Sequence, residues 1–326
     1  MHCLPAVAVL LILGLLCGCV DTATVHEWCY NGDVCGPSAW ITKPFGSCNG
    51  TRQSPIDIST DRAQTDQNLS QFSFSDYEDK HIMKEIVNTR RTVKVILNDS
   101  VEITGGGLQD SYHAIEFHLH WGNLHSVPGS EHKMDGKHFP MELHIVHFKK
   151  HYNYTLAMAD PTGIAVLGFL IEATDDKDTP LSWKLLTSKL DDISHNVTSA
   201  HLNLSLSLDD LLSGVNRSKF YRYPGSLTTP PCQESVLWTI FEEKIHVSKD
   251  LIDLFAKRLV HYPKAAVNIT NIYRPVQPLN SRTILASPGT KAGPLLTTGN
   301  VGGAPRLSVP STWLLVVTTA GLSFLR

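Results

Sequence analysis

Histidines recur at alternate positions within two apolar runs, and this pattern restricts the fold more than any other feature of the chain. The runs are residues 114–121 (AIEFHLHW) and 141–148 (MELHIVHF). Successive side chains of a β-strand point to opposite faces, so His118 and His120 share one face. A neighbouring antiparallel strand can place His144 opposite them. We therefore expect a sheet that brings three imidazoles together.

Three converging imidazoles form a catalytic zinc site with an open fourth position. The alternative is that these histidines are surface or satisfied core residues, since the chain contains 16 histidines. Two on one face and a third in a similar strand are much rarer by accident than a lone histidine. A ligand set without a carboxylate or thiolate leaves the full charge of the dication over a bound water and lowers its pKa. We therefore predict a Zn²⁺ cofactor held by His118, His120 and His144.

The rest of the folded part favours an α+β, sheet-dominated fold. Short apolar or β-branched and aromatic runs predict strands at residues 93–97, 115–121, 143–148, 164–171 and 235–241. Helices are predicted at residues 181–193 and 249–261, the second with Ser248 as its N-cap. Because strands dominate, we expect a single domain around a large, twisted, mostly antiparallel β-sheet with peripheral helices.

Both ends of the chain have the pattern of processing signals. Residues 4–18 are almost wholly apolar and too short to span a bilayer, which predicts a signal peptide at residues 1–23. Residues 313–325 are apolar or small and follow a Gly/Pro/Ser/Thr-rich stretch, as in a GPI-attachment signal. A transmembrane anchor is the alternative at each end. It is disfavoured because no stop-transfer charge follows the first segment and no basic tail follows the second.

The expected organisation follows from these signals. Residues 24–285 form the folded domain, residues 286–303 form a linker, and residues 304–326 are a removed propeptide. GPI attachment is expected between Asn300 and Gly303. The net charge is -3 and the basic residues are scattered, which argues against nucleic acid as a partner.

Cysteines and glycosylation sequons agree with secretion. Four cysteines lie beyond the predicted signal peptide: Cys29, Cys35, Cys48 and Cys232. They suggest two disulfides with three pairings open, whereas a thiolate metal site is less favoured because no CxxC spacing occurs. Eight Asn-x-Ser/Thr sequons indicate glycosylation at several of these sites: Asn49, Asn68, Asn98, Asn153, Asn196, Asn203, Asn216 and Asn268.

Several motifs resemble those of the α-class carbonic anhydrases. They are residues 117–121 (FHLHW), 129–132 (GSEH), 142–147 (ELHIVH), 226–231 (SLTTPP), 52–58 (RQSPIDI) and 273–275 (YRP). The resemblance covers roughly residues 28–282, and the cysteines and both termini resemble the membrane-anchored isozymes of the IV and XV type. It implies reversible hydration of carbon dioxide to bicarbonate and a proton, at the extracellular face of the plasma membrane on a GPI anchor. Bicarbonate or proton transporters are expected as neighbours.

The resemblance also implies roles for single residues. Thr228 would accept a hydrogen bond from the zinc hydroxide and donate its own proton to an ionised Glu131. Glu142 would accept the free N–H of His144, with His132 in the same buried network. The apolar wall for carbon dioxide would be Val146, Val166, Leu227, Val236 and Trp238. Tyr30 and Thr229 would hold an active-site water chain. The disulfides would be Cys29–Cys35 and Cys48–Cys232.

Two positions depart from the family pattern. Arg91 falls where fast members carry a proton-shuttling histidine, and a guanidinium cannot relay a proton at physiological pH. Slow, buffer-dependent proton export is therefore expected. Glu116 replaces the usual glutamine beside His118. A carboxylate there would make that ligand more electron-rich and raise the pKa of the zinc water, or it could rotate away from His118. A group of basic residues either attracts anions to the mouth of the site or forms an ordinary exposed basic strand: Arg90, Arg91 and Lys94.

Two other readings remain. One is a carbonic-anhydrase-like extracellular binding or adhesion module with weak or no activity. It is disfavoured because the chain keeps all three histidines together with Thr228 and Glu131. The other is a zinc esterase, which would be a side activity of the same site.

Overall fold

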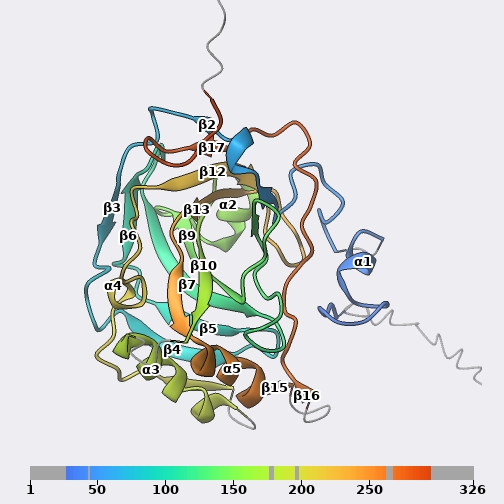
Figure 1. Ribbon diagram of the computed structural model, residues 1–326, viewed down its shortest axis with the longest axis vertical. Helices are drawn as coiled ribbons and strands as arrows, with labels where there is room; N and C mark the ends of the chain where they lie inside the picture. Colours follow the sequence, from blue (N-terminus) through green and yellow to red (C-terminus); the bar gives the residue numbers. More distant parts are fainter. Residues whose placement is uncertain (1–26, 43–44, 176–179, 195–197, 262–266, 295–326) are drawn as a thin grey trace, which may run out of the picture. The chain divides into compact units, whose positions relative to one another are not determined.

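The computed structural model describes residues 27–42, 45–175, 180–194, 198–261 and 267–294 (Figure 1). The predicted signal peptide, the predicted propeptide, the expected attachment residues and Asn196 lie outside these ranges. The described chain packs as one unit through Gly293, beyond the expected domain end at residue 285. Among the described residues, no helix combines the length and the apolar character that crossing a membrane requires.

One large sheet organises the described chain. Its main path follows the order β11-β4-β5-β7-β9-β10-β13-β12-β17-β2 (Figure 1). The strands of this path are β2 (Gln64–Thr65), β4 (Met83–Asn88), β5 (Val93–Leu97), β7 (Tyr112–Trp121), β9 (Met141–Lys149), β10 (Ile164–Thr174), β11 (Ser199–His201), β12 (Phe220–Gly225), β13 (Val236–Phe241) and β17 (Leu285–Ala286). The strands β3 (Phe72–Ser75), β6 (Glu102–Gly105) and β14 (Ile245–Ser248) join it from the side.

Two small sheets and several short helices complete the unit. The small sheets pair β1 (Asp57–Ile58) with β8 (Lys133–Met134) and β15 (Val260–His261) with β16 (Val267–Asn268). The helices are α1 (Pro37–Trp40), α2 (Tyr154–Ala159), α3 (Leu181–Ser188), α4 (Leu208–Leu211) and α5 (Lys249–Arg258), with 3₁₀ turns at Thr60–Arg62 and Asp191–Ile193. The expectation of a sheet-dominated α+β fold with peripheral helices is therefore confirmed.

Most neighbouring strands are antiparallel, as expected, and each predicted strand lies within an observed one or differs from it by one residue. The centre of the sheet is the run β5-β7-β9-β10, in which each pair is antiparallel. Strand β10 then pairs in parallel with both β13 and β14. Strand β10 reads as an almost continuous apolar run because its residues from Ile164 to Ile171 are all buried.

Both predicted helices are wrong in extent. The helix expected over residues 181–193 ends at Ser188, and a 3₁₀ turn follows after a break. Side-chain hydroxyls bond carbonyls of this helix, Thr187 to Trp183 O at 2.8 Å and Ser188 to Leu185 O at 2.7 Å, which competes with regular helix. The second helix ends at Arg258 rather than His261, because the chain turns into the extended pair β15–β16. Ser248 occupies its N-cap position, as predicted.

The two faces of the sheet bury separate apolar clusters. One contains alternate residues of β5 and β7 and is covered by helices, with Phe255 of α5 packed 5.4 Å from the Trp121 ring. Helices α3 and α5 lie beside each other at one end of the sheet (Figure 1). The other cluster contains Val166 and Trp238, next to the histidines of β7 and β9. The sheet thus presents those histidines beside a buried apolar surface.

Candidate metal centre

Neighbouring strands β7 and β9 bring the three predicted histidines together. His118 of β7 lies directly opposite His144 of β9, and His120 is two residues further along β7 on the same face. Each ring offers one nitrogen, and these three nitrogens lie within 4.8 Å of one another. His120 and His144 are buried, and His118 is half-buried toward the open side. The strand period therefore produces the convergence that the sequence predicts.

The outer nitrogen of each ring lies against an acceptor. His118 Nδ1 is 2.9 Å from Glu116 Oε1, His120 Nδ1 is 2.8 Å from the Ile272 carbonyl, and His144 Nε2 is 2.7 Å from Glu142 Oε1. An N–H that donates outward leaves a lone pair on the inner nitrogen, because a neutral imidazole has one of each. Burial is the largest influence on two of the rings. It lowers the pKa of His120 well below its usual range and that of His144 to about 4, so both stay neutral.

The inner nitrogens fit a tetrahedral metal ion. His144 Nδ1 and His118 Nε2 are 3.3 Å apart, and the buried His120 Nε2 has no hydrogen-bond partner. Ligand bonds of about 2.0–2.1 Å at tetrahedral angles separate two nitrogens by about 3.3–3.4 Å. Lone pairs at that distance repel unless a cation lies between them. The donor set and its spacing therefore suit Zn²⁺.

Glu142 anchors a buried network behind His144. Its Oε1 accepts from His144 Nε2 and from His132 Nδ1, both at 2.7 Å, and its Oε2 accepts the backbone N–H groups of Glu131 and His132 at 2.8 and 2.7 Å. Burial opposes the charge of Glu142, but His132 and His144 outweigh it and hold the pKa well below its usual range. His132 Nε2 lies 2.6 Å from the Tyr223 hydroxyl. The network fixes the ring of His144.

Glu131 and Thr228 meet at the inner side of His120. Glu131 Oε2 lies 3.3 Å from His120 Nε2, and Glu131 Oε1 accepts the Arg274 backbone N–H at 2.8 Å. Burial raises the pKa of Glu131 well above its usual range, whereas hydrogen bonding by the Thr228 hydroxyl and by Arg274 lowers it. Thr228 follows β12 and is 6% exposed. The structure therefore brings these two predicted residues to the histidines.

The five residues expected to form an apolar wall lie in one apolar cluster, which reaches the His144 ring through Trp238. Val146 lies opposite Val166 across β9 and β10, and Val166 lies opposite Trp238 across β10 and β13. The Trp238 ring is 4.8 Å from the His144 ring. Val236 belongs to the same apolar cluster, and Leu227 packs against it.

Arg91 is held by the N-terminal segment. Its Nε donates to the Trp28 carbonyl at 3.2 Å, and its guanidinium carbon lies 4.4 Å over the Trp28 ring. Trp28 in turn packs edge-on against Tyr30 at 5.3 Å, and the Tyr30 ring is 6.4 Å from that of His120. Burial raises the pKa of Tyr30 well above its usual range. The water chain expected at Tyr30 and Thr229 stays a prediction.

Two disulfides join the cysteines in the pairing that the resemblance implies. Cys29 pairs with Cys35, and Cys48 pairs with Cys232 across 184 residues of sequence. Cys232 lies in the turn that begins at Thr229, since its N–H donates to the Thr229 carbonyl at 2.8 Å. The long disulfide therefore ties the N-terminal segment to the loop that carries Thr228.

A model of the eukaryotic-type carbonic anhydrases matches residues 35–288. The chain belongs to this family. Its carbonic anhydrase relatives include carbonic anhydrase 4 of Rattus norvegicus, 35% identical over 300 residues that cover 90% of this chain and 93% of the relative. Carbonic anhydrase 4 of Oryctolagus cuniculus is 37% identical, with 91% and 92% covered. Carbonic anhydrase 7 of Homo sapiens is 37% identical, with 80% and 97% covered. The chain is therefore an enzyme of the carbonate dehydratase class, from a zinc-dependent family.

The sequence did not reveal several residues that hold this carbonic anhydrase site. Arg274 donates its backbone N–H to Glu131 and its guanidinium to Gln53 Oε1 at 2.9 Å. Tyr223 bonds His132, and the Ile272 carbonyl fixes His120. Gln53 and Arg274 lie in two of the motifs, so the sequence indicated that they matter but did not indicate what they do. A backbone carbonyl leaves no such signal.

Proposed function

We propose that this carbonic anhydrase hydrates carbon dioxide reversibly at the extracellular membrane surface, with His118, His120 and His144 holding Zn²⁺. One observation carries the proposal. The outer nitrogen of each ring lies against an acceptor, and the three inner nitrogens meet at metal-ligand spacing beside an apolar wall. A Zn²⁺ ion bound there supplies an acidified water as nucleophile, as is established for carbonic anhydrases, and its charge favours ionised carboxyls nearby.

Thr228 and Glu131 orient the reaction. An ionised carboxylate accepts only, so it commits the Thr228 proton to Glu131. The remaining lone pairs of the Thr228 oxygen then accept a hydrogen bond from the attacking oxygen, which aims that oxygen at the substrate carbon. The apolar side chains of Val146 and Trp238 offer the substrate a surface that binds neutral carbon dioxide better than water.

Proton export is the step in which this chain differs from the fast members of the family. The Arg91 guanidinium stays protonated and is stacked on Trp28, so it neither accepts nor relays a proton. We therefore propose that soluble buffer carries the proton away, which makes turnover depend on buffer concentration.

The extracellular location rests on the sequence signals and on the disulfides. Two disulfides form readily in an oxidising compartment and are rare in the cytosol. A signal peptide would deliver the chain there, and a GPI anchor would retain it at the membrane, near transporters of bicarbonate or protons.

The test is carbon dioxide hydration by the secreted protein at several imidazole concentrations, with zinc quantified in each sample. We expect activity that needs zinc and rises with imidazole. Arg91→His should lose most of the imidazole dependence, whereas the control Arg90→His changes a neighbouring exposed arginine and should keep it. Fast turnover of the wild type in weak buffer would refute the missing shuttle. An inactive protein with stoichiometric zinc would favour the binding-module reading.

A further inference from the structure

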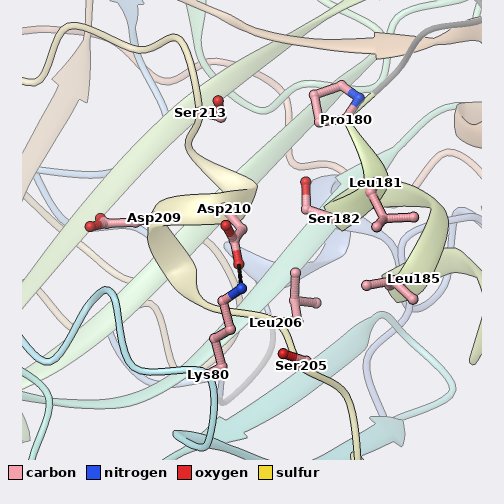
Figure 2. A pocket seen from close by; sticks show the side chains of 10 residues that line it. All are labelled: Lys80, Pro180, Leu181, Ser182, Leu185, Ser205, Leu206, Asp209, Asp210 and Ser213. Atoms are coloured by element: carbon pink, nitrogen blue, oxygen red, sulfur yellow. Dashed lines mark ion pairs between the residues drawn. The ribbon is translucent and has the colours of Figure 1, made fainter.

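A cavity lies between helices α3 and α4. Its volume is about 300 Å³, at the small end of the range for ligand pockets, and none of its lining residues belongs to the metal centre (Figure 2). Hydroxyl groups and leucines share the lining: Ser182, Ser205, Ser213, Leu181, Leu185 and Leu206. The cavity is therefore amphipathic.

Exposed groups of both kinds line this cavity. Leu181 is 68% exposed, which is high for a large apolar side chain. Ser205 and Ser213 are also exposed, so an occupant of the cavity can reach their hydroxyls. An occupant with both polar groups and an apolar face would pair with these hydroxyls and cover Leu181.

The charged groups at the cavity are already compensated. Lys80 Nζ lies 3.9 Å from Asp210 Oδ2 (Figure 2), and Asp209 Oδ1 lies 2.8 Å from Arg217 Nη1. Each carboxylate therefore has a cation beside it, and neither an anion nor a cation gains much by entering. The lining favours a neutral, polyhydroxylated ring, since such a ring has hydroxyls at its edge and C–H groups on its faces.

A glycosylation sequon adjoins the cavity. Asn203 is followed by Leu204 and by Ser205, which lines the cavity. Burial alternates along this segment, with Leu202 and Leu206 buried, Leu204 half-buried, and Asn203 and Ser205 exposed. Asn203 and Ser205 therefore share the outward face, with Cα atoms no more than about 7 Å apart.

We propose that the N-glycan of Asn203 seats its first N-acetylglucosamine in this cavity. The sugar is neutral, its hydroxyl and amide groups can pair with the exposed hydroxyls of Ser205 and Ser213, and its C–H face and methyl group can cover Leu181. Because the glycan is tethered close by, its effective concentration is in the millimolar range and weak contacts suffice. The inference rests on the proposed secretion, since sequons are glycosylated on that route.

Asn216 offers a matched control. It is also exposed and lies near the cavity residue Ser213 in the sequence, but its Oδ1 is engaged by the N–H and hydroxyl of Ser218 at 3.0 and 2.7 Å. That local turn directs the Asn216 side chain to its own loop. A glycan there should add nothing to the packing of α3.

The experiment compares three forms of the full chain from a secreting host. These are the intact glycoprotein, the form trimmed by an endoglycosidase to one N-acetylglucosamine per site, and the form stripped by an amidase. We expect the trimmed form to keep the melting temperature of the intact protein and the stripped form to melt about 2–4 °C lower. Amide exchange in Leu181–Ser188 should accelerate only in the stripped form. Asn203→Asp reproduces the stripped product at that site and should remove the difference, whereas Asn216→Gln should keep it.

Several results would overturn the proposed seating of the Asn203 glycan. Equal melting and exchange of the trimmed and stripped forms would overturn it, as would an effect that follows Asn216 instead. Glycans on other sequons with Asn203 unmodified would overturn it while leaving secretion intact. Absence of glycan at every sequon would overturn the inference alone if the chain is still exported, and it would overturn the proposed secretion as well if the chain stays inside the cell. Ser213→Ala should shrink the trimmed-to-stripped difference, because it removes an exposed hydroxyl of the cavity with which the sugar can pair.

Discussion

The two disulfides close loops of very different length, which sets their expected contributions to stability. Cys48–Cys232 joins residues 184 apart, whereas Cys29–Cys35 joins residues 6 apart. The loop-entropy relation gives about 5 kcal/mol for the long loop and about 2 kcal/mol for the short one. Replacing both cysteines of a pair by alanine leaves no unpaired thiol. The long-loop variant should therefore lose more than twice the free energy of unfolding that the short-loop variant loses.

Urea-induced unfolding at a fixed zinc concentration measures both losses. The long-loop variant should also show a larger m-value, because its unfolded chain is no longer cross-linked and exposes more surface. Cys232 follows Thr228 in the same loop, so hydration activity should fall while zinc content stays constant. Equal losses for the two variants, or a smaller loss for the long loop, would refute the reasoning from loop entropy.

Two further predictions concern buried groups. Glu142→Gln keeps the shape of the side chain but turns an amide N–H₂ toward existing N–H donors, so zinc affinity should fall about 10–100-fold in a chelator competition. The control Glu172→Gln changes a half-buried glutamate that pairs with Lys137 away from the histidines, and it should leave zinc affinity unchanged. Equal zinc affinities of Glu142→Gln and the wild type would contradict the role of Glu142. Burial lowers the pKa of His147 to about 3, so below its unfolded pKa the unfolded chain takes up a proton that the folded chain does not. The free energy of unfolding should therefore fall by about 2 kcal/mol because of His147 as the pH is lowered from about 6.5 to 5. In urea titrations over this pH range, His147→Gln should lose about that much less than the wild type. An identical loss in both proteins would contradict the role given to His147.

The sequence predicts the convergence of the three histidines and the central strands well because both depend on local periodicity. An alternation of two residues fixes which side chains share a face, whatever the rest of the sheet does. His118, His120 and His144 therefore needed only the pairing of two adjacent strands.

The parts that the sequence does not predict depend on long-range or backbone contacts. The parallel pairing of β10 with β13 joins segments that no local pattern connects. The Ile272 carbonyl and the Arg274 N–H are backbone groups, which every residue carries, so their bonds to His120 and Glu131 have no sequence pattern. The early end of α3 at Ser188 was also missed by the sequence analysis, because apolar spacing continues through Ile193. The hydroxyls of Thr187 and Ser188 bond carbonyls of the preceding turn, which weakens the helix at this point.

The three histidines that we propose as ligands are close in the chain, but one of the groups that hold them is remote. His118 and His144 are 26 residues apart, whereas the carbonyl that holds His120 is 152 residues away from it. At about 5–20 residues per second, synthesis of the 128 residues that follow His144, up to Ile272, takes roughly 6–26 s. During that interval the nascent chain already carries three chelating side chains whose orientation is not yet fixed. Which metal ion these histidines bind then follows the intrinsic affinity of imidazole groups, which is higher for Cu²⁺ than for Zn²⁺. Selection of the correct ion therefore depends on the metals available where the chain folds.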